Sequence, residues 1–288
     1  MSAPRPRPLE TLRKCARVVW LAMCKYSETD GELRAASFAY YAFFALFPLL
    51  LLLISIGSMF VDPEAVQGKI VTFVDEYLPV AAELVNTTIG AVLKTRGSAG
   101  FVALLGLGWS SLRFFQSLVH GVNRAWGTHE IVWWRLPLKN LAMIGIVASA
   151  LVVGVIAPVI LKYIEWYSWE IVYSVSARVM VFLFKLLEWI FATAVLFYGF
   201  SMFYKFAPRR KTAFSEVWFA AAAVAIGLQV VRDLFVLYVL RFANFNMLYG
   251  TLGGVVALLM WIYLSGSIII FGGCLSAAQA EIKEAGEE

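Results

Sequence analysis

Charged side chains are scarce in this 288-residue chain. Lys, Arg, Asp and Glu make up 15% of its residues, against about 25% in soluble globular proteins. Residues 36–60 contain no Asp, Glu, Lys, Arg or His at all. A helix of that length reaches about 37 Å, which exceeds the hydrocarbon core of a bilayer at roughly 30 Å. The scarcity of charge therefore argues against a wholly soluble protein and predicts a membrane-spanning segment.

Cysteine and histidine are also few, and the motifs of soluble enzymes are missing. The chain has three cysteines and two histidines, which are Cys15, Cys24, Cys274, His120 and His129. Their spacing fits no metal site, and an odd number of scattered cysteines argues against a disulfide framework. There is no phosphate-binding Gly-Lys-Ser/Thr loop and no Gly-x-Ser-x-Gly nucleophile elbow. We therefore expect no enzymatic activity, no metal site and no cofactor.

Apolar residues, in contrast, make up 61% of the chain, and its mean hydropathy is +0.78. We expect an all-α integral membrane protein with six transmembrane helices. The expected spans are Ala36–Phe60, Ala99–Val119, Leu138–Ile160, Val179–Tyr204, Phe214–Leu240 and Leu248–Leu275. Residues 61–98 form the longest outside loop, and we expect short amphipathic helices within it.

The distribution of Lys and Arg predicts the orientation. With the N-terminus inside, 15 of the 24 fall in cytoplasmic segments and six in outside segments. This bias places both termini in the cytoplasm and supports an even number of spans. The chain then divides into a basic segment at 1–35, a transmembrane domain at 36–275 and an acidic tail at 276–288. We expect the glutamates of that tail to be solvated.

Residues 9–25 have the pattern of an amphipathic helix. Glu10, Arg13, Lys14 and Arg17 share one face, and Leu9, Leu12, Ala16, Val19, Trp20 and Met23 share the other. Such a helix suits the anionic cytoplasmic leaflet of a membrane. An ordinary helix packed on the bundle would show the same pattern. The expected partners are therefore membrane lipids, and nothing in the sequence indicates a nucleic-acid partner.

Charged and polar side chains inside the expected spans are the candidate binding residues. They are Arg113, Gln116 and His120 in the second span, Lys185 and Glu188 in the fourth, and Gln229, Arg232 and Asp233 in the fifth. Charges at membrane depth are costly, so such residues face the bundle interior or an aqueous cavity. One interpretation is a net cationic chamber for an anionic head group. In the other, Lys185–Glu188 and Arg232–Asp233 neutralise locally and only hold helices together.

Small residues and one proline are expected to shape the helix packing. The positions are Pro48, as a kink in the first span, and Gly250, Gly254, Ser265 and Gly272, on or near one face of the sixth. Small side chains let helix backbones approach closely in a membrane. The pattern is equally consistent with packing within one chain and with dimerisation, so it leaves the oligomeric state open.

Three stretches carry a resemblance to a known family. They are AASFAYYAFFALFPLLLLL in the first span, WSSLRFFQSLVHGVNRAWG in the second, and YGTLGGVVALLMWIYLSGSIIIFGGCLSAAQAE at the end. Together they resemble the YihY/BrkB family of bacterial inner-membrane proteins. The resemblance implies a role in envelope integrity, and lipid transport has been proposed for some members. It also brings the old label ribonuclease BN, although this chain lacks the metal cluster or acid–base pair that a nuclease needs.

The sequence therefore favours a membrane protein that transports or flips an anionic lipid or amphiphile. A cation/proton antiporter that titrates Glu188 and Asp233 is one alternative. A non-transporting envelope scaffold is the other.

Overall fold

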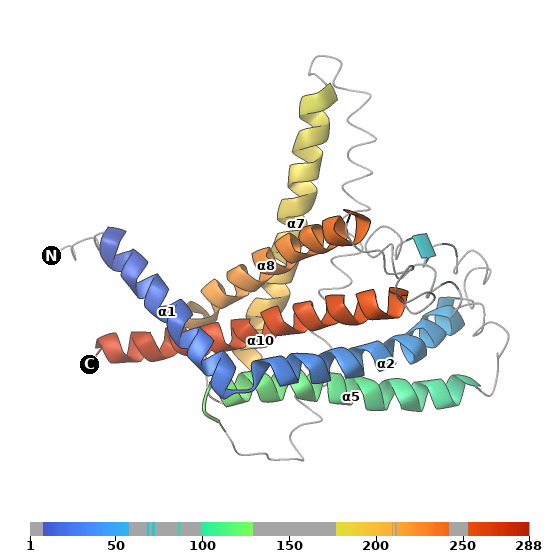
Figure 1. Cartoon of the computed structure of the whole chain (residues 1–288), viewed down its shortest axis with the longest axis horizontal. Coiled ribbons are helices and arrows are strands. Elements are labelled where there is room, and N and C mark those ends of the chain that lie inside the picture. The colour runs from blue at the N-terminus through green and yellow to red at the C-terminus, as the bar shows by residue number, and fades with distance from the viewer. Residues whose placement is uncertain are drawn as a thin grey trace. The chain divides into compact units, whose positions relative to one another are not determined.

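The computed structural model describes residues 8–57, 68, 71–72, 86, 99–128, 177–208, 210, 212–241 and 253–287. Within these residues the chain forms six long helices and no strand (Figure 1). They are α1 (Pro8–Glu28), α2 (Gly31–Gly57), α5 (Ala99–Ala125), α7 (Ala177–Phe206), α8 (Phe214–Arg241) and α10 (Gly253–Glu287). The all-helical class predicted from the sequence is confirmed.

Three of these helices are long and apolar enough to cross a membrane. They are the segments Phe182–Phe206, Phe214–Tyr238 and Gly253–Ala285, with mean hydropathies of 1.6, 1.8 and 2.2. The apolar run that begins at residue 36 lies largely in α2, which also contains Pro48. The expected span at 138–160, Gly250 and nearly all of the outside loop at 61–98 fall outside the described residues. The number of spans and the side of each terminus stay predictions.

The chain divides into two compact units, and the first comprises Met1–Lys25, Val122–Gln229 and Phe271–Glu288. The C-terminal part of α10 forms its centre, because residues 272–278 are all buried. Gly272 lies directly against Val224 of α8 and Tyr204 of α7. A Cβ atom built on Gly273 would lie 2.9 Å from Cγ2 of Val122 in α5. Adjacent glycines therefore let three other helices approach α10 closely.

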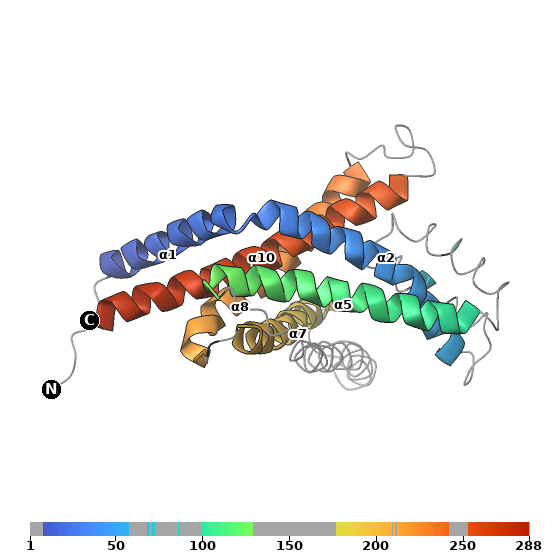
Figure 2. The same cartoon turned by 90° about the horizontal axis from the view of Figure 1, so that it is seen from below.

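The second unit comprises Tyr26–Gly121 and Val230–Ile270. Here α2 packs beside the parts of α5 and α10 that belong to this unit (Figures 1 and 2). Gly266 of α10 faces the ring of Phe38, and Gly121 of α5 faces Ile270. The hydroxyl of Ser117 donates to the carbonyl of Arg34 at 3.3 Å, which joins α5 to α2.

A two-residue turn connects α1 to α2. Asp30 has a φ of 54°, a conformation that Asp tolerates better than most residues. The buried Thr29 exposes no more than 4% of its surface, and its carbonyl accepts a hydrogen bond from Nε of Arg34 at 2.7 Å. This bond ties the turn to the first helical turn of α2.

Candidate functional site

The structure places the predicted charged residues on exposed helix surfaces. Arg113, Lys185, Glu188 and Asp233 are exposed, and Arg232 is partly exposed. Gln116 and His120 are half-buried, and Gln229 is buried. That these charges face the bundle interior or an aqueous cavity, and that they form one chamber, stays a prediction.

Arg113 has an aromatic neighbour on its own helix. Its guanidinium carbon lies 4.7 Å from the centre of the Trp109 ring, one turn earlier in α5. An arginine over a tryptophan face makes a favourable cation–π contact. The contact does not neutralise the charge, and among the described residues no carboxylate lies within ion-pair distance of Arg113. Arg113 thus remains a net positive charge on the surface of α5.

The charges of α8 pair locally. Nε of Arg232 donates to Oδ1 of Asp233 at 3.0 Å, and a second guanidinium nitrogen lies 3.0 Å from the same oxygen. This agrees with the interpretation in which Arg232 and Asp233 neutralise each other. One turn earlier, Gln229 exposes 3% of its surface, and its Nε2 has no hydrogen-bond partner. Gln229 is therefore the one predicted site residue with a buried, unused donor.

Lys185 and Glu188 share a turn of α7 without pairing. Both are exposed, and the structure shows no ion pair between them. The large apolar side chains around them are exposed as well, including Phe182, Leu186 and Trp189. Local neutralisation, which the sequence allowed for this pair, is not observed. One positive and one negative charge instead stand separately on an apolar helix surface.

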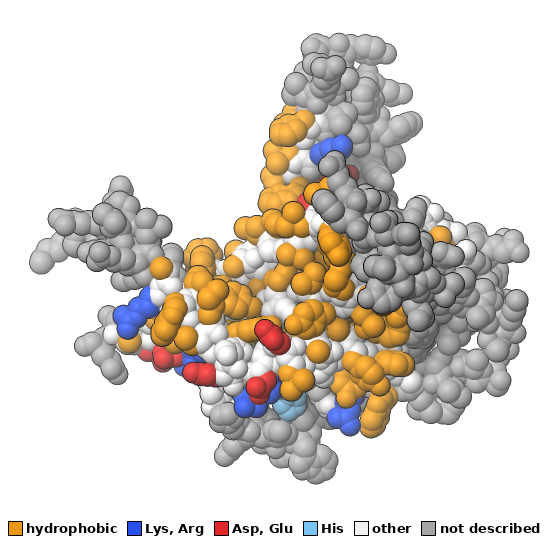
Figure 3. Space-filling view, in the orientation of Figure 1, with side chains coloured by type: hydrophobic (Ala, Val, Ile, Leu, Met, Phe, Trp, Pro, Cys, Tyr) orange, Lys and Arg blue, Asp and Glu red, His pale blue; other side chains and the backbone are white. Residues whose placement is uncertain are grey.

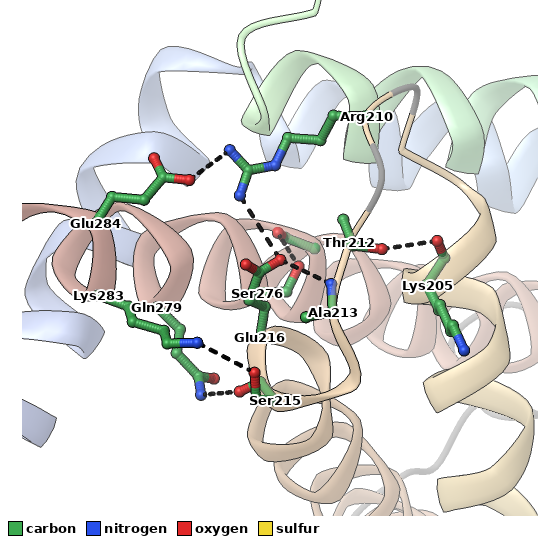
Figure 4. Close-up of polar contacts among 11 residues, drawn as sticks. Lys205, Arg210, Thr212, Ala213, Ser215, Glu216, Ser276, Gln279, Lys283 and Glu284 are labelled. Atoms are coloured by element: carbon green, nitrogen blue, oxygen red, sulfur yellow. Dashed lines mark hydrogen bonds and ion pairs between the residues drawn. The ribbon is translucent and has the colours of Figure 1, made fainter. Parts of the chain in front are cut away.

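A dense polar cluster that sequence reasoning missed joins the α7–α8 loop to α10 (Figure 4). Arg210 in the loop contacts Glu216 at 3.6 Å and Glu284 at 2.9 Å. Its guanidinium carbon also lies 4.5 Å from the centre of the Trp126 ring. We call Arg210, Glu216, Glu284 and Trp126, together with the residues hydrogen-bonded beside them, the loop cluster.

The loop cluster also caps α8 and holds its first turn on α10. The amide of Ala213 donates to Oε2 of Glu216 at 3.1 Å, which is one half of a capping box. Gln279 of α10 donates to the carbonyl of Ser215 at 2.9 Å, and Lys283 donates to its hydroxyl at 3.4 Å (Figure 4). Charge and hydrogen bonding therefore fix where α8 begins relative to the end of α10.

Two glutamates of the predicted acidic tail belong to these contacts. Residues 276–287 continue α10, and Glu284 binds Arg210. Glu281 forms an ion pair with Lys25 of α1 at 2.8 Å. The expectation of glutamates that are only solvated is therefore wrong for both. The available signal was the run of basic residues at 209–211, which the sequence analysis used for topology alone.

Asn123 completes the loop cluster from α5. Its side chain donates to the carbonyl of Ala207 at 3.0 Å and accepts from the hydroxyl of Thr128 at 3.0 Å. Asn123 is 8% exposed and Ala207 is fully buried. Sequence reasoning did not single out this residue, because an asparagine near a helix end is usually taken as a simple cap.

We expect Asn123→Ala to lower the free energy of unfolding by about 1 to 3 kcal/mol, since the buried carbonyl of Ala207 loses its partner. Thr193→Val is the control, because that exposed hydroxyl bonds only its own helix, at the carbonyl of Trp189. The control should change stability by less than about 0.5 kcal/mol. Denaturation of both variants in the same detergent measures the difference. Equal effects would show that the Asn123 bond is not a main support of this unit.

Among the described residues, no group of three or more His, Cys, Asp and Glu side chains is placed to hold a metal ion. What the described residues offer is two kinds of polar feature. The loop cluster is paired and structural, whereas Arg113 and the Lys185–Glu188 turn are unpaired and lie on apolar helices. Only the second kind has charge left to bind a ligand.

Comparison with known proteins agrees with this membrane architecture. Residues 22–288 match the family model described as virulence factor BrkB. A protein of Bacillus subtilis named as the ribonuclease-like protein YfkH is 28% identical over 92% of this chain and 95% of its own length. A UPF0761 membrane protein of Alteromonas mediterranea is 22% identical over 92% and 88%. Another, from Actinobacillus pleuropneumoniae, is 26% identical over 79% and 80%. No solved structure matches.

Proposed function

Because this chain belongs to the virulence factor BrkB family of membrane proteins, we propose that it moves an anionic lipid or another anionic amphiphile across the bacterial inner membrane. The observation that carries this proposal is the charge of Arg113, which no carboxylate of the described residues pairs. It stands fourteen residues after the start of α5 and twelve before its end. Within the expected span Ala99–Val119, Arg113 stands six residues, or about 9 Å, before the end at Val119.

In the proposed topology α5 spans the membrane, and Arg113 then lies within the apolar part of the span. Leaving its charge in hydrocarbon costs several kcal/mol, although the amount depends on how much water enters. A phosphate or carboxylate head group beside the guanidinium would remove this cost by forming charge-assisted hydrogen bonds. The acyl chains of the same molecule would stay in lipid. An amphiphile therefore satisfies both the charge and its apolar surroundings.

The exposed surface of α7 has the same combination. Hydrophobic side chains cover it (Figure 3), and Lys185 stands among them. Lys185 lies eight residues after the start of α7 at Ala177, and a long lysine side chain can extend toward the membrane interface. In our proposal Lys185 and Arg113 each offer a positive charge to an anionic head group from their own helix. Arg232, already paired with Asp233, would contribute less.

We further propose the topology on which this role depends. The chain crosses the inner membrane six times, with both termini in the cytoplasm, as the bias in Lys and Arg indicates. The protein acts as a carrier and not as an enzyme. Its expected ligands are membrane lipids, and it has no nucleic-acid substrate.

Lipid binding to the purified protein tests the proposal. The test compares variants of two side chains of opposite charge, Lys185 and Glu188. Native mass spectrometry in mild detergent should show phosphatidylglycerol retained in preference to phosphatidylcholine. Lys185→Gln should weaken that preference, whereas Glu188→Gln, one turn away on the same exposed surface, should preserve or strengthen it. A weaker preference for phosphatidylglycerol in Glu188→Gln would favour the antiporter. If neither Lys185→Gln nor Glu188→Gln changes lipid binding, the result would favour the scaffold.

A further inference from the structure

Helix α1 packs on the protein through a side that excludes most of its large apolar residues. Val18 and Ala22 are its buried residues, and Lys25 on the same side pairs with Glu281 of α10. Three large apolar side chains remain exposed, with Val19 at 37%, Trp20 at 65% and Met23 at 59%. Of the two interpretations of this helix, packing of its apolar face on the bundle is not observed for these three residues.

The angular order of these residues shows how α1 is organised. At 100° per residue, Val19, Met23 and Trp20 fall within about 100° of one another. The buried residues lie next to this sector on one side. Positions 13, 14 and 17, all basic, lie next to it on the other side, and Arg17 is exposed. Helix α1 thus has a packing face, an exposed apolar face and a basic face.

We propose that the exposed apolar face of α1 docks on a bilayer surface that contains anionic lipid. Val19, Trp20 and Met23 would insert among the upper acyl chains, and the basic face would contact the head groups. Tryptophan favours this interface, and basic residues beside an apolar face bind anionic leaflets. Charge complementarity therefore identifies the partner as anionic lipid in preference to a second copy of this cationic chain.

Chain connectivity supports the same partner. Only Thr29 and Asp30 separate α1 from α2, and the apolar run of α2 is long enough to cross a bilayer. In the proposed topology, the end of α1 at Glu28 therefore lies close to the membrane surface. The ion pair between Lys25 and Glu281 and the burial of Val18 and Ala22 fix which face remains outward. The docking requires only that the protein is membrane-embedded and does not depend on lipid transport.

A fluorophore at position 23 of the full-length protein tests this proposal. Cys15 and Cys24 are replaced by serine, the buried Cys274 is kept, and Met23→Cys carries an environment-sensitive label. The comparison label is at Glu28→Cys, which is exposed in the sector of the basic face and would lie at the level of the head groups, outside the acyl chains. The protein is placed in vesicles of phosphatidylcholine alone and in vesicles that also contain phosphatidylglycerol. Emission and quenching by aqueous acrylamide report how deeply each label lies.

With phosphatidylglycerol present, the label at position 23 should emit at shorter wavelength and resist quenching, while the label at position 28 stays accessible. Arg13→Gln, Lys14→Gln and Arg17→Gln should each weaken the docking about fivefold, which corresponds to about 1 kcal/mol per basic residue. Strong quenching of position 23 in anionic vesicles would overturn the proposal. Equal shielding of position 23 in phosphatidylcholine alone would also overturn it, because docking would then not require anionic lipid.

Discussion

Replacing Gly272 by leucine is expected to leave no folded protein in detergent extracts. Gly272 is buried in α10, and a Cβ atom at this position would overlap Cγ2 of Val224 and the hydroxyl of Tyr204. Tyr204 is itself fully buried, so its ring has little room to move away. Overpacking of this kind costs about 1 to 3 kcal/mol for a few added atoms, and more when backbone must shift.

A graded series separates this packing effect from a general intolerance of glycine replacement. Gly272→Ala should already lower the free energy of unfolding by about 2 kcal/mol. Gly121→Ala is the matched control, because a Cβ atom there would lie 3.6 Å from Arg34 and Ile270, an ordinary contact. That variant should gain up to about 1 kcal/mol, since alanine favours a helix over glycine. Thermal unfolding of the purified variants gives the ranking, and equal stability of the two alanine variants would contradict this account of α10.

Arg113→Gln should abolish transfer of an anionic lipid between leaflets while the protein remains folded and inserted. The reason is that Arg113 contributes a net charge and a contact with Trp109, but no described ion pair that holds helices together. Removing an unpaired membrane charge costs little stability and can even raise it. Arg113→Lys should keep part of the transfer rate, because lysine retains the charge but loses the planar fork that binds a phosphate through two donors.

Transfer of a labelled phosphatidylglycerol in reconstituted vesicles measures these rates, and thermal unfolding of the same preparations checks the fold. Trp109→Phe is the companion variant, since it keeps an aromatic face beside Arg113 and should retain most of the rate. A normal transfer rate in Arg113→Gln would show that this charge does not meet the substrate. A large loss of stability in that variant would instead indicate that Arg113 holds the bundle together.

Local patterns predicted the helices because they depend on neighbours along the chain. The segment at 9–25 is helical as expected and extends over Pro8–Glu28. Helix α10 runs beyond the predicted end of the last span at Leu275 to Glu287. Its continuation, SAAQAEIKEAGE, is rich in good helix formers, and Glu281 and Glu284 are held by Lys25 and Arg210. Hydropathy defines a membrane span but cannot show where a helix ends outside it.

The candidate site was predicted in its residues but not in its geometry. Arg113, Lys185 and Arg232 are conspicuous because charge is rare in apolar segments, whereas their exposure depends on which helix faces find partners. Of the predicted packing positions, Gly272 lies in close contact, while the hydroxyl of Ser265 bonds the carbonyl of Trp261 in its own helix. Gly254 is half-buried, and Gly266 and Gly273 make close contacts that the sequence did not single out.

Contacts between distant segments were the least predictable. Arg210 and Glu284 are 74 positions apart, and nothing local indicates that they meet. The packing face of α1 was equally hard to predict. Its most apolar side is exposed, and its small residue Ala22 is buried. Periodicity identifies an apolar face, but the shape of the neighbouring helices decides whether that face is the one that packs.

The most direct test of the central claim is the selectivity of leaflet-to-leaflet transfer by the wild-type protein. Purified protein is reconstituted into vesicles with a trace of fluorescent phosphatidylglycerol or of fluorescent phosphatidylcholine, and an impermeant reductant bleaches only the label in the outer leaflet. If exposed membrane cations carry an anionic head group, the inner-leaflet phosphatidylglycerol will become accessible faster than in protein-free vesicles, and faster than phosphatidylcholine. Transfer of both lipids at the protein-free rate would contradict the account.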